Sequence, residues 1–236
     1  AGFGLLALLA VLAFAANVAT GSVRIPPSAV TSILFGQGSD NTAWNRVVVQ
    51  LRLPQAVTAF VSGAALAVSG LQMQTLFRNP LAGPFVLGIS SGASLGVAMV
   101  VLSGSAGGAA FLALSGTLGH VFAGITGASV VLLLVLFTSR RVPTLTLLIL
   151  GVLFGYATSA LVSILLRFSS AESVQSYVIW TLGDFGGVSW SQLGWLVSLL
   201  AVGLAVAGFC VKPLNALLLG ESYARSMGVG VDRVRV

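Results

Sequence analysis

The sequence has few charged residues and almost no residues that bind metals. Only 7% of its 236 residues are charged, 57% are hydrophobic, and the mean hydropathy is +1.05. Because a soluble domain carries about 25% charged residues, this composition does not supply the polar surface of a water-soluble globule. One histidine, one cysteine and five scattered acids form no ligand cluster, so we expect no metal, cofactor or catalytic centre.

Motifs for binding nucleotides or nucleic acids are also missing. The only lysine, Lys212, follows an apolar run rather than a glycine-rich loop, so the chain has no Walker A motif and any ATP must be hydrolysed by a partner. The arginines lie between apolar runs rather than in one basic stripe, which disfavours nucleic-acid binding. Cys210 stands alone and cannot form a disulfide within the chain.

Six apolar runs are long enough to cross a bilayer, which takes about 20 residues per helix. Proline, glycine and arginine interrupt the sequence between them and are expected to end the helices. The runs cover residues 3–19, 53–71, 85–102, 112–138, 145–166 and 193–211, and the interruptions fall at 24–27, 78–80, 103–108, 140–143 and 212–213. The sequence therefore predicts an all-α membrane protein, built as a multi-span helical bundle.

The distribution of basic residues predicts the orientation of the chain. The second and fourth connections and the tail hold seven of them, against four in the other three connections. The seven are Arg78, Arg140, Arg141, Lys212, Arg225, Arg233 and Arg235, and the four are Arg24, Arg46, Arg52 and Arg167. Because basic residues collect on the cytoplasmic side, we expect both ends there, with the acids Asp40, Glu172 and Asp184 outside.

The two ends of the sequence suggest a piece of a longer protein. The first run lacks the basic segment that opens a secretory signal, and the chain starts inside an apolar helix at Ala1. It stops in the charged stretch 232–236. We therefore expect further spans after Val236.

Small residues recur at helical spacing within two of the runs. Gly88, Gly92 and Gly96 are four residues apart in the third run, and Gly151 and Gly155 repeat this in the fifth. Such spacing favours close packing of membrane helices. A translocation path lined by small and weakly polar residues is the alternative interpretation. Its candidates are Ser90, Ser94, Gly151, Gly155, Thr158 and Ser159.

Two other functions compete with transport. The segment from Gly88 to Gly92 fits the G-x-S-x-G pattern, so Ser90 and His120 could form an intramembrane serine hydrolase. That pattern normally sits at a strand-to-helix turn, which the sequence does not predict here. A passive channel would need rings of charge or an ordered carbonyl motif, and neither is evident.

The tail, residues 214–228, is too short and too broken to span. It keeps apolar residues such as Leu217 and Met227 beside Glu221 and Arg225, which predicts one or two short helices at the membrane surface. Isolated helices of this length are only marginally stable in water. The segment must therefore be stabilised by contact with the membrane, the rest of the chain or the groove of a partner.

Several short motifs follow one another along nearly the whole chain. They are Arg52-Leu53-Pro54, Ser62-Gly63-Ala64-Ala65-Leu66-Ala67, Ser69-Gly70, Gln74, Arg78-Asn79-Pro80-Leu81-Ala82-Gly83-Pro84, Leu87-Gly88, Gly92-Ala93, Leu219-Gly220-Glu221, Ala224 and Met227-Gly228. In this order they resemble the FecCD family, the iron-chelate, haem and cobalamin permeases of ABC importers.

The resemblance implies a subunit of about ten transmembrane helices, of which six are present here. It implies pairing with a second permease copy, as a homodimer or pseudo-dimer, in the bacterial cytoplasmic (inner) membrane. Two ATP-binding subunits and a periplasmic substrate-binding protein would complete the importer. The implied cargo is a metal chelate, with iron-siderophore first and haem and cobalamin behind it. Residues 1–236 would form one permease domain, incomplete at its C-terminal end.

The resemblance also implies roles for particular residues. Arg52 falls where the family places a basic residue that docks on carboxylates of the binding protein. Gln55 departs from a second basic residue that some members carry, which leaves the docking charge weaker or supplied by Arg46. The span 145–166 would line the translocation path.

A cytoplasmic coupling segment, residues 214–230, would contact the ATPase. Its implied contact residues are Leu219, Gly220, Glu221, Ala224, Met227 and Gly228. Met227 replaces the usual leucine, which conserves side-chain volume. We expect the small Ala224 to permit close approach of the partner subunit.

Overall fold

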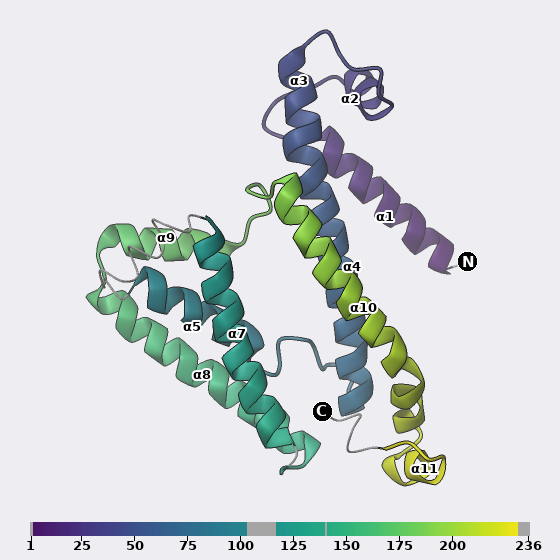
Figure 1. Ribbon diagram of the computed structural model, residues 1–236, viewed down its shortest axis with the longest axis vertical. Helices are drawn as coiled ribbons and strands as arrows, with labels where there is room; N and C mark the ends of the chain where they lie inside the picture. The colour runs from purple at the N-terminus through teal and green to yellow at the C-terminus, as the bar shows by residue number, and fades with distance from the viewer. Residues whose placement is uncertain (1, 103–116, 140, 231–236) are drawn as a thin grey trace. The chain divides into compact units, whose positions relative to one another are not determined.

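A computed structural model describes residues 2–102, 117–139 and 141–230, and these are helical with connecting turns and no strand. The predicted all-α class is confirmed. Figure 1 shows the helices, with the label α6 unused. Their bounds are α1 Gly2–Ala19, α2 Pro27–Leu34, α3 Thr42–Arg46, the π-helix η1 Val47–Arg52, α4 Leu53–Phe77, α5 Ile89–Val101, α7 Thr117–Ser139, α8 Thr144–Phe168, α9 Ala171–Leu182, α10 Trp190–Leu218 and α11 Glu221–Ser226.

Within residues 2–102, 117–139 and 141–230, five helical stretches are long and apolar enough to cross a membrane. They are Gly2–Ala19, Thr42–Phe77, Leu118–Ser139, Thr146–Phe168 and Trp190–Leu218, while the apolar α5 is shorter. Large apolar side chains on these helices are exposed, as with Phe3 at 91% and Phe209 at 84%. Such a surface suits contact with lipid chains, so the spans agree with a membrane-embedded bundle.

The third apolar run becomes helical later than predicted. Residues 85–88 form turns, in which the Gly88 N–H donates to the Phe85 carbonyl at 3.1 Å. Gly88 has φ +75°, a left-handed conformation that suits glycine because it has no Cβ. Helix α5 therefore has 13 residues, a length of about 20 Å, against about 30 Å for a bilayer core.

The predicted break at Lys212-Pro213 is wrong. Helix α10 continues through Pro213 to Leu218. A proline removes one N–H donor and crowds the preceding turn, but the following turn is held by packing, because Leu214 and Leu217 are buried. The predicted connection 103–108, the start of the fourth run at 112–116, and Arg140, Arg233 and Arg235 lie outside the described residues.

The chain divides into two compact units. The first unit consists of Ala1–Val68 with Asp184–Gly208, and the second of Ser69–Gly183 with Phe209–Val236. Each unit has its own buried clusters, and each is described by itself below.

In the first unit, a small apolar cluster holds the connection between α1 and α4. Its buried members are Val18, Ile25, Val30, Ile33, Val48 and Ala56. Proline at the first position of α2 starts that helix, and the Asn41 side chain caps α3 by accepting the N–H groups of Ala43 and Trp44. The connection is therefore folded onto the end of α1 and the start of α4.

One carbonyl of the π-helix η1, that of Val49, accepts its hydrogen bond from a donor outside the helix. In η1 the bonds run five residues back, as from the Leu53 N–H to the Val48 oxygen. By the same pattern the Val49 oxygen would accept from residue 54, but Pro54 has no N–H. Instead, the Trp190 indole Nε1–H donates to the Val49 oxygen at 2.9 Å. This bond anchors the start of α10 to η1.

In the second unit, α5 packs backbone to backbone against α7. A Cβ added to Gly96 would overlap the carbonyl oxygen of Ala123, and one added to Gly127 would overlap that of Gly92. Residue numbers rise along α5 as they fall along α7, so the two helices are antiparallel. The close packing predicted from the glycine spacing is present at this contact.

Helix α8 runs parallel to α5 on another side. A Cβ on Gly151 would overlap the Val86 oxygen, and Gly155 lies opposite the Ser91 side chain. Near the far end of α5, Ser169 donates its hydroxyl to the Leu102 carbonyl at 2.7 Å. Helix α5 therefore contacts α7, α8 and α9, as the teal and green ribbons in Figure 1 show.

Contacts within each unit agree with helices that cross in alternate directions. In the first unit Trp190, which follows the fifth connection, meets Val49 of the first connection. In the second unit, Ser169 of the fifth connection donates a hydrogen bond to Leu102, which lies at the start of the third connection. Leu76, which precedes the second connection, packs with the tail near Ala224. Which end faces the cytoplasm remains the prediction made from the basic residues.

Removing the indole donor should weaken the start of α10. Trp190→Phe leaves the Val49 oxygen unpaired, and we expect the protein to lose about 0.6–1.5 kcal/mol of stability in detergent. Pro54→Ala restores a backbone N–H at the position that proline leaves empty. In the Pro54→Ala background, Trp190→Phe should therefore lower the stability by less. Heat-induced aggregation of the wild type, the two single variants and the double variant measures this. Equal costs in both backgrounds would show that the indole does not replace the proline N–H.

Candidate functional site

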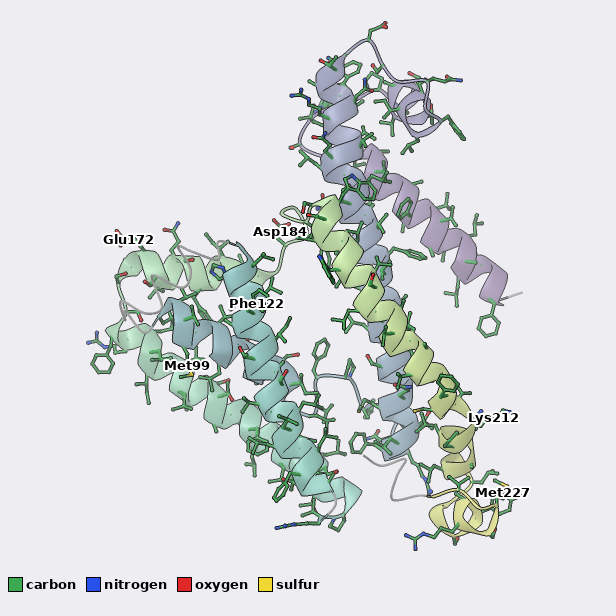
Figure 2. The ribbon with its side chains drawn as sticks, in the orientation of Figure 1. Met99, Phe122, Glu172, Asp184, Lys212 and Met227 are labelled. Atoms are coloured by element: carbon green, nitrogen blue, oxygen red, sulfur yellow. The ribbon has the colours of Figure 1, made fainter. Side chains whose placement is uncertain are left out.

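The predicted coupling segment folds as a helix, a tight turn and a second short helix. Helix α10 ends at Leu218, Gly220 adopts φ +123°, and α11 begins at Glu221. Gly228 ends the segment with φ +80°, and its N–H donates to the Arg225 carbonyl at 3.0 Å. Of the one or two short helices predicted for this region, one is present as α11, and residues 214–218 belong to the end of α10. Figure 2 labels Lys212 on α10 and Met227 at the end of α11.

Ala224 lies inside this segment rather than on its surface. Its side chain is 0% exposed and packs with Leu214 and Leu217 of α10, while Leu76 and Val229 lie against the same cluster. The expectation that Ala224 permits close approach of a partner is therefore corrected. A small residue here permits close approach of α11 to α10 within the chain.

The exposed residues of the segment include apolar and basic side chains. Leu219 is 67% exposed and Met227 is 51% exposed, and Gly228 and Arg225 are also exposed. Exposed apolar side chains on a short, internally packed helix are suited to contact with another protein. Leu219 and Met227 are thus the implied coupling residues that are best placed to make such a contact.

The two arginines predicted for docking lie in different environments. Arg46 is exposed at the end of α3, whereas Arg52 is only 5% exposed. Arg52 donates from Nη1 to the Val18 and Ala19 carbonyls at 3.1 and 2.9 Å, and from Nη2 to the Val23 carbonyl. Docking through Arg52 stays a prediction, and it would require these hydrogen bonds to break.

The six candidate path residues do not share one environment. Ser90 and Ser159 are exposed, while Gly151 and Thr158 are buried, the first of them in backbone contact with residue 86. Ser94 and Gly155 are half-buried. Ser159 is therefore the most accessible candidate for a path along α8. Gly151 instead packs against the turn before α5.

Ser94 binds another side chain of the second unit. Its hydroxyl is hydrogen-bonded to Tyr177 of α9, a helix outside the candidate spans, and Tyr177 stacks on Trp180. Burial raises the pKa of the Tyr177 hydroxyl above its ordinary value, and the Ser94 bond opposes this by a smaller amount. Tyr177 is therefore neutral at physiological pH, and the pair holds α9 on α5.

The packing of α5 on α7 separates Ser90 from His120. Gly92 lies opposite Gly127 and Gly96 opposite Ala123, so the antiparallel register places His120 opposite residue 99. Nine residues of helix separate position 99 from Ser90, a distance of about 13 Å along the axis. A nucleophile and its base must lie about 3 Å apart, so this arrangement does not support the hydrolase alternative.

Sequence reasoning missed the bonds made by Trp190 and Tyr177. Pro54 does signal an unpaired carbonyl in the preceding turn, since it lacks an N–H. Nothing in the sequence identifies the donor, which lies 141 positions away from Val49. Tyr177 carried no signal, because a tyrosine in a short connecting helix has no spacing relationship to Ser94.

Long apolar helices with exposed apolar side chains, packed through glycines, define a helical integral membrane protein. Residues 8–236 match the model of the FecCD transport family. The chain belongs to this family.

Similar proteins of known function support this assignment. The chain is 38% identical over 184 residues to the vitamin B12 import system permease protein BtuC of Citrobacter koseri and 39% identical to that of Escherichia coli, covering 77% of this chain. The matches cover 53% and 54% of those proteins, so the chain spans about half the length of the relatives it matches.

A solved structure has the same fold. It is described as an inward-facing conformation of a metal-chelate type ABC transporter, with a TM-score of 0.79 and 28% sequence identity. The match covers 99% of this chain and 69% of that chain. The helical arrangement of this chain is therefore shared with that solved structure.

The Ser94–Tyr177 bond should be visible in a double-mutant cycle. Ser94→Ala and Tyr177→Phe each remove one partner, and each should lower the stability of the full-length permease by about 1 kcal/mol. The double variant should lose little more than either single variant, because the two changes remove the same bond. Thermal unfolding in detergent measures this, and strictly additive losses would show that the two side chains act independently.

Proposed function

We propose that the chain belongs to the membrane-spanning permease of a binding-protein-dependent ABC importer. The match of the family model to residues 8–236 carries this proposal. The membrane is proposed to be the bacterial inner membrane, with the ends of the chain in the cytoplasm. A second copy of the permease, as a homodimer or pseudo-dimer, would complete the path. A passive channel would need no ATPase, and the tests below distinguish it.

The proposed cargo is a large metal chelate. The relatives are named for vitamin B12 import, and the solved structure is described as metal-chelate type. These names support cobalamin as the first candidate, ahead of iron-siderophore and haem, whereas the resemblance in sequence implied iron-siderophore first. At 38–39% identity the ligand has to be determined by binding. A panel of chelates added to the matching binding protein identifies it, since saturating ligand at about 100 times Kd stabilises that protein by about 2.7 kcal/mol.

ATP hydrolysis is proposed to take place in two partner subunits that bind the coupling segment. Leu219 and Met227 offer exposed apolar contacts, while Ala224 holds α11 against α10 so that both contacts keep their positions. Because this short helix is stabilised by its own packing, movement of a partner against it would be passed to α10.

The contact with the ATPase is tested at Met227. Met227→Glu places a carboxylate on the proposed interface without changing the packing around Ala224, and burying an unpaired charge is costly. We expect the full-length permease to retain its ATPase at least about tenfold less well through purification. Met227→Leu is the matched control and should retain the ATPase fully.

Proteolysis distinguishes a lost contact from a misfolded segment. Met227→Glu should leave the cleavage rate of residues 214–230 unchanged, whereas Ala224→Trp should raise it by displacing α11. Full retention of the ATPase by Met227→Glu, together with normal coupled ATP hydrolysis, would overturn the assignment of this segment.

A further inference from the structure

Helix α7 has one buried face and one exposed face. Val131 and Val135 are buried in a cluster with Leu87, before the start of α5. The exposed face carries large apolar side chains at the helical spacing of three and four residues. These four residues, called the α7 stripe below, are Val130, Leu133, Leu134 and Phe137. Because α7 is a candidate membrane span, the stripe suits contact with a lipid chain.

The α7 stripe has about the depth of one leaflet. Nine residues separate Val130 from Ser139, where α7 ends, which is about 13 Å along the helix axis. Half of a hydrocarbon core of about 30 Å is about 15 Å. A single acyl chain can therefore follow the stripe from the middle of the membrane to the end of the helix.

Arg141 lies at the end of this stripe. Its guanidinium carbon is 4.6 Å from the centre of the Phe137 ring, and its backbone N–H donates to the Thr138 carbonyl at 2.9 Å. The side chain is exposed. A guanidinium that stacks on a ring keeps its N–H donors free at its edge, where their fork matches the oxygens of a phosphate.

The charge of Arg141 is not balanced by an acid on the neighbouring helices. Residues 41–171 contain no aspartate or glutamate, and this range includes the whole of α4, α5, α7 and α8. Within the second unit, residues 69–171 carry four basic side chains, at Arg78, Arg140, Arg141 and Arg167. A basic residue next to a span attracts anionic lipid headgroups.

We propose that the α7 stripe and Arg141 form a binding site for an anionic phospholipid. An acyl chain lies along the stripe, and the headgroup phosphate binds the Arg141 guanidinium, which the Phe137 ring supports. A zwitterionic lipid has the same phosphate, but its ammonium group is repelled by the arginine. The site depends on α7 crossing the membrane, and it does not depend on the cargo or the ATPase partner.

The site is tested by photo-crosslinking the protein in phosphatidylcholine nanodiscs. Two probes carry the same diazirine on the acyl chain, one with a phosphatidylglycerol headgroup and one with a phosphatidylcholine headgroup. We expect the phosphatidylglycerol probe to label residues 130–139 about fivefold more than the other at low salt. The ratio of the two labelling yields should fall as salt is added.

Substitutions separate a site from a general attraction to a basic protein. Arg141→Gln should bring the labelling ratio to about one, and Phe137→Leu, which keeps an apolar side chain but removes the ring, should lower it at least about twofold. Arg167→Gln is the matched control, because this exposed arginine lies about 34 Å along α8 from its start near Arg141. It should leave the ratio unchanged. All three changes are at exposed side chains, so the unfolding temperature should stay that of the wild type.

Two results would overturn the proposal. Equal labelling of the wild type by both probes would mean that the stripe does not select an anionic lipid, and would leave Arg141 for an acidic protein partner. A ratio that survives Arg141→Gln, or that falls equally with Arg167→Gln, would show that the net charge of the protein attracts the lipid without a site at Arg141.

Discussion

The second unit depends on the direct contact of helix backbones through glycine. Lipid chains are as apolar as leucine, so no hydrophobic force drives helices together in a membrane, and close packing has to do this instead. Gly92, Gly96 and Gly127 remove the side chains between α5 and α7, and Gly151 does the same between α8 and the turn before α5. Helix α5 is too short to span alone, and these contacts surround it with longer helices.

Irregular backbone in such a protein must find donors and acceptors within the chain, because lipid supplies none. Side chains donate hydrogen bonds to such carbonyls at three places: Arg52 at the end of α1, Trp190 at η1 and Ser169 at the end of α5. Each donor comes from a residue distant in sequence, so the bond that satisfies a carbonyl also joins two elements. The connections are thereby ordered parts of their units. Exposed residues such as Arg24 and Met227 therefore project from backbone that is held in place.

Features of the fold that depend on local sequence could be predicted. The apolar runs located the long helices, and the glycine spacing predicted close packing of α5 against another helix, because both follow from helix geometry alone. The end of α10 could not be predicted, since the turns after Pro213 are held by packing around Ala224. The late start of α5 also depends on contact, because residue 86 packs on Gly151 of a distant helix.

The environment of the candidate site residues was harder to predict than their identity. The resemblance assigned Arg52 and Ala224 to family motifs as contacts with partners, but both side chains are buried within the chain. A motif records that a residue type is needed and does not distinguish contact with a partner from support of a neighbour. Long-range bonds such as Arg52 with Val18 make that distinction.

The most direct test of this account is the thermal stability of the protein with alanine at Gly127. A methyl group there would meet the backbone of Gly92, and overpacking of this kind costs about 1–3 kcal/mol. Gly63→Ala in α4 is the matched control, because a Cβ at Gly63 has no neighbour within 4 Å. The account predicts that Gly127→Ala lowers the unfolding temperature and that Gly63→Ala does not lower it. Equal stability of the two variants would contradict backbone contact as the basis of the second unit.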